Sequence, residues 1–287
     1  MEPIQHILSV QDQLGEGPLW DPACGLLYWL DIESNLYHTL NPVTNAHEIV
    51  SFKNQCVGVM AQRTAGGMVT AGSNGFGFWD PDTQTWSPIV DPEAHKPQSR
   101  FNDGAVDRRG RFWAGTLGDA DQNGLYCLNP DLSLRQMESG ISVSNGIGWS
   151  PDNRVMYYTD SGPAVIYAYD FDLESGNLSN RRVFVGNTRP GTPDGLTVDC
   201  EGFIWSARWD GWCVDRYDPD GKLERTIPMP VQRPTSVMFG DANLERLYIT
   251  SARTELSPSD LAAQPLAGDL FACYPGVKGL PEPRFAG

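Results

Sequence analysis

The chain has few basic residues. Its 21 lysines and arginines face 36 aspartates and glutamates, which leaves a net charge of −15. Without a basic patch to neutralise phosphates, a nucleic-acid partner is not expected. No apolar run reaches the roughly 20 residues of a membrane span, and the first residues lack the basic and apolar segments of a secretory signal. We therefore expect a cytoplasmic protein with no membrane or nucleic-acid partner.

Histidine and paired cysteine are also scarce. The four histidines show no metal-ligand spacing and the six cysteines form no Cys-x-x-Cys pair, which argues against zinc sites of the histidine or thiolate type. No Gly-x-Ser-x-Gly motif offers a serine nucleophile, and no Gly-x-Gly-x-x-Gly motif opens a helical pattern for a dinucleotide. The even number of cysteines permits disulfides, but without an export signal we expect free thiols in a reducing compartment.

A repeat is the main feature that the sequence does contain. A turn rich in glycine, aspartate and asparagine is followed by a short strand-like run with aromatic or β-branched residues. This pattern occurs six times, at Leu26-Leu-Tyr-Trp29, Met68-Val-Thr70, Arg111-Phe-Trp113, Val155-Met-Tyr-Tyr158, Phe203-Ile-Trp205 and Arg246-Leu-Tyr248. No apolar pattern of helical period runs for any length between these marks.

The period of the repeat predicts the fold. Equivalent anchor positions are spaced by 42, 44, 43, 49 and 41 residues, and they are Glu16, Gly58, Asn102, Asn145, Asp194 and Thr235. Four short strands with three turns need roughly 40 to 50 residues, the size of one propeller blade. The sequence therefore predicts an all-β fold, a six-bladed β-propeller that forms a single domain over residues 1–287.

Two β-sandwiches in tandem are the alternative, since 287 residues are enough for two domains. No glycine- and serine-rich tract, charge block or change of composition marks a linker, so we favour one ring. We expect a strand within residues 4–10 to complete the last blade beside residues 268–274, because ring closure removes two exposed sheet edges.

Three polar residues share one phase of this repeat. Glu16, Asn145 and Asp194 lie at equivalent anchors, and the innermost strand of every blade lines the central channel, so their side chains should point to one axis. Two carboxylates and an amide carbonyl form an oxygen-only ligand set, which suits Ca²⁺, Mg²⁺ or Mn²⁺ and is compatible with Fe²⁺ or Zn²⁺. Each residue alone also fits an ordinary turn. Their shared phase favours a central metal site.

The third unit offers contacts to a substrate. Arg100 presents a planar fork of donors, and Asn102 has both a donor and an acceptor. We expect Asp103 to cap a turn and not to touch substrate. Asp119 and Asp121 resemble half of a calcium loop but lack its glycine and distal glutamate, so they are expected to lie in a solvated turn.

At this point the sequence resembles a known family, the senescence marker protein/gluconolactonase family, also called regucalcin-like. The resemblance runs nearly from end to end. It is carried by Gly15-Glu-Gly-Pro-Leu-Trp20, Arg100-Phe-Asn-Asp-Gly104 and the following residues to Thr116, Ser144-Asn-Gly-Ile-Gly-Trp149, Tyr158-Thr-Asp-Ser161, Pro193-Asp-Gly195, Gly268-Asp-Leu-Phe271, Gly276-Val-Lys-Gly-Leu-Pro281 and Phe285-Ala-Gly287. It implies a six-bladed propeller with one divalent metal ion in the channel and hydrolysis of sugar lactones.

The family's metal ligands fall on the three residues named above, and its substrate contacts fall on Arg100 and Asn102. Two departures concern the choice of sugar: Ala105 stands where a lysine is frequent, and no glutamate follows Gly115-Thr116, so Asp119 or Asp121 is the candidate substitute. The resemblance implies hydrolysis of an aldonolactone of the gluconolactonase, xylonolactonase or arabinolactonase type, with Asp194 handling the proton of the attacking water.

Two other functions remain open from the sequence. One is a promiscuous organophosphate or aryl-ester hydrolase, since a cation that polarises a carbonyl can also polarise a phosphoryl oxygen. The other is a calcium-binding regulatory or ligand-binding propeller without catalysis.

Overall fold

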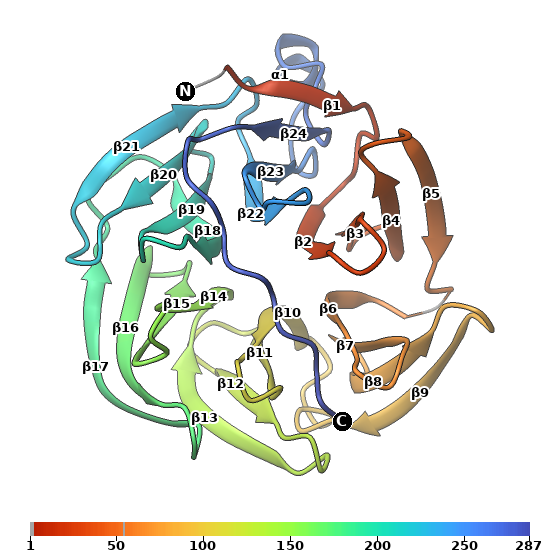
Figure 1. Ribbon diagram of the computed structural model, residues 1–287, viewed down its shortest axis with the longest axis vertical. Helices are drawn as coiled ribbons and strands as arrows, with labels where there is room; N and C mark the ends of the chain where they lie inside the picture. Colours follow the sequence, from red (N-terminus) through yellow and green to blue (C-terminus); the bar gives the residue numbers. More distant parts are fainter. Residues whose placement is uncertain (1–2, 54) are drawn as a thin grey trace.

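Six four-stranded sheets form a ring around a central channel (Figure 1). The computed structural model describes residues 3–53 and 55–287. From the inside outward, the first blade consists of β2 (Gly15–Asp21), β3 (Leu26–Asp31), β4 (Leu36–Asn41) and β5 (Ala46–Ser51), and the second of β6 (Val57–Gln62), β7 (Met68–Gly72), β8 (Gly75–Asp80) and β9 (Thr85–Val90). The third blade consists of β10 (Arg100–Val106), β11 (Phe112–Leu117), β12 (Asn123–Leu128) and β13 (Leu134–Ile141), and the fourth of β14 (Ser144–Trp149), β15 (Val155–Asp160), β16 (Val165–Asp172) and β17 (Asn177–Val185). The fifth blade consists of β18 (Thr192–Val198), β19 (Ile204–Trp209), β20 (Cys213–Tyr217) and β21 (Leu223–Pro228), and the sixth of β22 (Pro234–Gly240), β23 (Arg246–Ser251), β24 (Leu270–Cys273) and β1 (Gln5–Leu8).

The predicted six-bladed β-propeller is therefore confirmed, and the tandem sandwiches are excluded. Neighbouring strands within each blade are antiparallel, for example β2 with β3 and β18 with β19. The one helix among the described residues is α1 (Pro258–Ala263), which begins with a capping box at Ser257. It has six residues, and no described helix is long and apolar enough to cross a membrane. All six cysteines are free, as expected.

Large aromatic side chains fill the space between blades. Trp113 on β11 packs with residues of the fourth blade, and Trp205 on β19 packs with residues of the sixth. Each indole N–H donates to an aspartate six residues earlier, Asp107 at 2.8 Å and Asp199 at 2.9 Å. Burying one large apolar side chain contributes about 1.5 to 3 kcal/mol. In the third and fifth blades, the aspartate of the turn and the tryptophan of the following strand thus tie the turn to the core.

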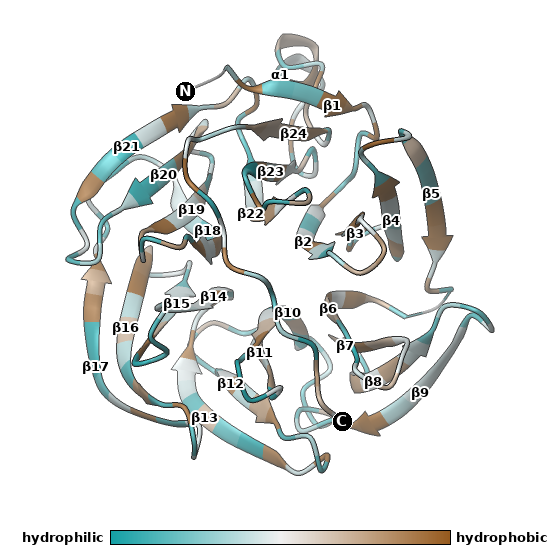
Figure 2. Cartoon of the chain, viewed as in Figure 1, coloured by the Kyte–Doolittle hydropathy of each residue, from teal (hydrophilic) through white to brown (hydrophobic). Residues whose placement is uncertain are grey.

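The N-terminal strand closes the ring. β1 pairs antiparallel with β24, with Gln5 opposite Ala272 and His6 opposite Phe271. The Asp269 carboxylate accepts the backbone N–H of Val10 at 2.9 Å. This confirms the expected closure of the last blade. The outer strands mix hydrophilic and hydrophobic residues (Figure 2), and β17 is largely exposed, whereas the innermost strand β18 is almost entirely buried.

The C-terminal segment, residues 275–287, runs from β24 across one end of the channel (Figure 1). It is fixed to several blades by backbone hydrogen bonds: the Cys200 N–H donates to Lys278, the Phe285 N–H to Gln62 and the Ala286 N–H to Gly110, over 2.9 to 3.0 Å. The channel therefore has one end that is covered by the chain itself.

Candidate functional site in the central channel

Bulges in the innermost strands aim polar side chains at the axis. A bulge interrupts regular pairing and turns the side chains that it carries. In four of the innermost strands, two consecutive residues have no partner on the next strand of the blade. They are Asn102 and Asp103 in β10, Asn145 and Gly146 in β14, Asp194 and Gly195 in β18, and Thr235 and Ser236 in β22. In β2 the register shifts between Glu16 and Leu19. The anchors found in the sequence are thus the residues at or next to the bulges.

The structure brings Glu16, Asn145 and Asp194 together. Their exposed fractions are 6%, 5% and 4%. Asn145 Nδ2 donates to Ser161 Oγ at 2.9 Å, and this hydroxyl donates to the carbonyl of Pro193 at 2.7 Å, next to Asp194. Because the amide nitrogen of Asn145 is turned toward Ser161, its amide oxygen faces Asn102.

The two carboxyl groups are desolvated and repel each other. Burial and then the charge of Asp103 raise the pKa of Glu16 to about 8, opposed in part by the Gly17 N–H. Burial, followed by the charges of Glu16 and Asp103, raises the pKa of Asp194 well above its ordinary value. Carboxyl groups from three different blades therefore lie close enough to influence one another.

Asp103 was not expected in this group. It lies inside β10 and not in a turn, it is 8% exposed, and its carboxyl accepts the Gly104 N–H at 2.7 Å. The expectation that it caps a turn is wrong, because the bulge turns the side chain inward. The sequence held a signal: Asp103 stands directly before a glycine, as Glu16, Asn145 and Asp194 do.

Arg100 and Asn102 join the group through hydrogen bonds. Asn102 Nδ2 donates to the Ser144 carbonyl at 2.9 Å and to Asn145 Oδ1 at 3.2 Å. Arg100 Nη1 donates to Asn102 Oδ1 at 2.7 Å. Asn102 thus contacts the amide oxygen of Asn145, which is a candidate cation ligand. It lies between the candidate ligands and Arg100, the candidate substrate contact.

Arg100 has unused donors. Its described hydrogen bonds involve Nη1 alone, which reaches the Phe101 carbonyl at 3.1 Å in addition to Asn102. Burial lowers the pKa of this guanidinium, although nearby Cys56, Glu16 and Glu33 act in the opposite direction. Since arginine carries five N–H donors, several are left for an oxygen-rich ligand.

A hollow of about 210 Å³ opens beside Arg100. Its wall includes Glu93, whose carboxylate accepts hydrogen bonds from Lys96 and Tyr126 at 2.9 Å each, and from Ser99. Asp119 and Asp121 are exposed in the segment between β11 and β12. Their role in contacting a substrate stays a prediction.

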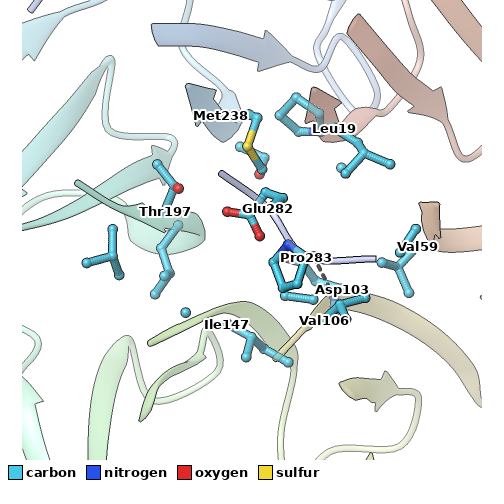
Figure 3. Close-up of a pocket in the computed structure, with 18 of the residues that line it drawn as sticks. Leu19, Val59, Asp103, Val106, Ile147, Thr197, Met238, Glu282 and Pro283 are labelled. Atoms are coloured by element: carbon cyan, nitrogen blue, oxygen red, sulfur yellow. Dashed lines mark hydrogen bonds between the residues drawn. The ribbon is translucent and has the colours of Figure 1, made fainter. Parts of the chain in front are cut away.

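A smaller cavity lies between the site and the C-terminal segment. Its volume of about 70 Å³ is room for a few water molecules. Asp103 lines it together with later residues of the inner strands, and Leu280, Glu282 and Pro283 close it. Figure 3 shows the Glu282 side chain reaching into this cavity from the C-terminal segment. Burial raises the pKa of Glu282, and Arg108 opposes the rise.

The donor set fits a hard cation. Glu16, Asp103 and Asp194 bring three carboxyl groups to a buried place, where a divalent cation would favour their ionised forms, and Arg100 lowers the pKa of Glu16 only in part. Carboxylate and amide oxygens are the ligands that Ca²⁺, Mg²⁺ and Mn²⁺ prefer. No group of three or more His, Cys, Asp or Glu side chains among residues 3–53 and 55–287 has metal-binding geometry. The fit is therefore one of donor chemistry, with the Asn145 amide as the third ligand.

The ring of six blades and the buried acidic group on its axis define a propeller with a channel-centred polar site. The chain belongs to the family described as SMP-30/Gluconolactonase/LRE-like region, which matches residues 14–253. It is 37% identical to a 6-deoxy-6-sulfogluconolactonase of Pseudomonas putida (100% of this chain, 99% of the relative) and 35% identical to the pentonolactonase XacC of Haloferax volcanii (98% and 97%).

A solved structure has the same fold. The chain is similar to a protein of Agrobacterium tumefaciens described as a calcium-binding protein, regucalcin, with a TM-score of 0.94 and 28% identity over 98% of this chain and 97% of that one. The resemblance seen in the sequence is therefore confirmed at the level of the family and of the fold.

Proposed function

We propose that the protein hydrolyses a sugar lactone to the open aldonic acid, with an aldonolactone of the gluconolactone, xylonolactone or arabinonolactone type as substrate. The observation that carries this proposal is the buried group of Glu16, Asn145 and Asp194 next to the unused donors of Arg100. Two relatives that match almost the whole chain are named as lactonases, which supports a lactone-hydrolysing enzyme.

A divalent cation (Ca²⁺, Mn²⁺, Mg²⁺, Fe²⁺ or Zn²⁺) held by Glu16, Asn145 and Asp194 would polarise the lactone carbonyl and stabilise the charge that develops on its oxygen. Asp194 takes a proton from water as the water oxygen bonds to the carbonyl carbon. The ring C–O bond then breaks, and the proton passes to the departing ring oxygen. The products are one hydroxyl and one carboxylic acid, so the atoms balance.

Arg100 and Asn102 orient the sugar. The hollow beside Arg100 lies at the same strand end as the acidic group, and the free guanidinium N–H groups can donate to hydroxyl oxygens there. Asn102 is held by Arg100 and by Ser144, so its position is fixed before a ligand arrives. Such preorganisation removes the entropy cost of ordering this side chain when the sugar binds.

The test is a rate assay with gluconolactone, xylonolactone, arabinonolactone and a phosphotriester, before and after chelation. We expect turnover of at least one sugar lactone, its loss on chelation and its return with a divalent cation. Glu282→Gln serves as the control, because Glu282 lies at the far end of the small cavity and should not change turnover. Full activity of a rigorously metal-free preparation would overturn the mechanism.

A second function is favoured by one finding, the likeness to the Agrobacterium protein described as calcium-binding. In this case the same residues would bind Ca²⁺ without catalysis. Calorimetric Ca²⁺ binding together with no turnover of any lactone in the assay would select this function.

A further inference from the structure

The bulge of β10 carries an acidic side chain where the inner strands of the next two blades have no room for one. Asp103 is the second bulge residue, and the equivalent residues of β14 and β18 are Gly146 and Gly195. A Cβ on Gly146 would lie 2.5 Å from the backbone nitrogen of Leu196, and one on Gly195 would lie 2.1 Å from Ser236 Oγ. The third blade therefore has space for a group that the fourth and fifth exclude.

Within the part of the chain that the structure describes, no basic side chain forms an ion pair with this carboxyl. Burial raises the pKa of Asp103 to about 6, and the hydrogen bond from the Gly104 N–H opposes this rise. An isolated charge in a buried place is expensive unless it is paired or coordinates a metal. The folded protein nevertheless places this carboxyl beside two others.

The location of Asp103 links the acidic group to the small cavity. The charge of Asp103 raises the pKa values of both Glu16 and Asp194, so it lies within their electrostatic reach. Its carboxyl also lines the cavity that has room for a few waters. It is thus near the candidate ligands but faces the water-sized space between them and the C-terminal segment.

We propose that Asp103 is a positioning residue of the cation site, an outer-sphere carboxylate whose charge strengthens the binding of a divalent cation without ligating it. This inference rests on the proposed function, since it requires a cation at Glu16, Asn145 and Asp194. A third negative charge favours a divalent ion over a monovalent one, because the attraction grows with the charge of the ion. Without the ion, the same charge weakens the fold.

The charge of Asp103 should strengthen cation binding and destabilise the metal-free protein, and one substitution tests both effects. In Asp103→Asn, titration calorimetry with Ca²⁺ or Mn²⁺ should show affinity about 10- to 100-fold weaker, the usual effect of losing an outer-shell partner. The metal-free variant should melt at a higher temperature than metal-free wild type. At saturating cation its kcat should return to near the wild-type value. Asp103→Ser, which copies Ser236 at the same bulge position of β22, should behave alike.

Glu282→Gln is the matched control. Glu282 is a carboxyl at the other end of the same cavity, and it does not contribute to the raised pKa values of Glu16 or Asp194. Its loss should leave cation affinity unchanged. Equal affinity of wild type and both Asp103 variants would overturn the inference while the proposed function stands. Absence of cation binding by the wild type would overturn both.

Discussion

Replacing Glu16 by glutamine should stabilise the metal-free protein and destabilise the cation-loaded one. Glu16 is 6% exposed, and burial together with the charge of Asp103 raises its pKa from 4.5 to about 8. At neutral pH the unfolded chain ionises this group while the folded, metal-free protein keeps it protonated. A glutamine removes that difference but also removes a charged ligand from the proposed cation.

The sign and size follow from linkage between protonation and folding. Below pH 4.5 both states are protonated, so Glu16 costs nothing. Between pH 4.5 and about 8 only the unfolded state loses its proton, and the stability of the metal-free wild type falls as pH rises. At pH 7 the loss is about 3 kcal/mol. For a chain of 287 residues this corresponds to roughly 5 °C in Tm.

Scanning calorimetry of both proteins, with chelator and with excess cation, measures the effect. Metal-free Glu16→Gln should melt about 5 °C above wild type at pH 7 and nearly together with it at pH 4.5, and the order should reverse with cation. Glu93→Gln is the matched control. Burial alone would raise the pKa of Glu93, but hydrogen bonds from Ser99, Lys96 and Tyr126 hold it below its ordinary value, so this variant should melt lower. A Glu16→Gln protein that melts below wild type without metal would refute the reasoning.

Four further predictions concern chemistry, substrate binding, cation binding and closure. Asp194→Asn, saturated with cation, should stay folded but lose at least about 100-fold in kcat, and near-wild-type turnover would move the base elsewhere. Arg100→Ala should raise KM for sugar lactones at unchanged metal stoichiometry. Asn102→Ala should in addition weaken cation binding, because Asn102 contacts Asn145 Oδ1 at 3.2 Å; calorimetry that shows equal affinity would remove Asn102 from that role. Deletion of residues 1–10 removes β1 and its pairing with β24, so the Tm should fall by several degrees, and unchanged melting would contradict this closure.

The six-bladed ring could be predicted from the sequence because the residues that mark each repeat lie close together in the chain. A turn aspartate and a tryptophan six residues later, as at Asp107 and Trp113, recur in the chain and bind each other in the fold. The anchors at Glu16, Asn145 and Asp194 were found by the same regularity, since the bulge of each of their strands begins at the anchor or directly after it.

What could not be predicted depends on contacts between distant segments. Asp103 occupies the second bulge position of β10, one residue after the anchor Asn102, and the bulge that turns its side chain inward depends on the pairing of β10 with β11. The path of residues 275–287 is set by backbone hydrogen bonds to residues such as Gln62 and Gly110, which carry no sequence pattern. The burial of Glu282 follows from that path.

Because the C-terminal segment covers one end of the channel, ligands reach the site from the other end. The space behind the site measures about 70 Å³ and is closed by the C-terminal segment, so a molecule of sugar size must leave by the opening through which it entered. The acid product should then inhibit competitively against the lactone. A sugar in place would also stand between the proposed cation and the solvent, so a chelator should strip the ion more slowly from ligand-saturated protein than from free protein. The rate at which the ion is lost would thus depend on whether a sugar occupies the one open end of the channel, and no moving lid would be needed.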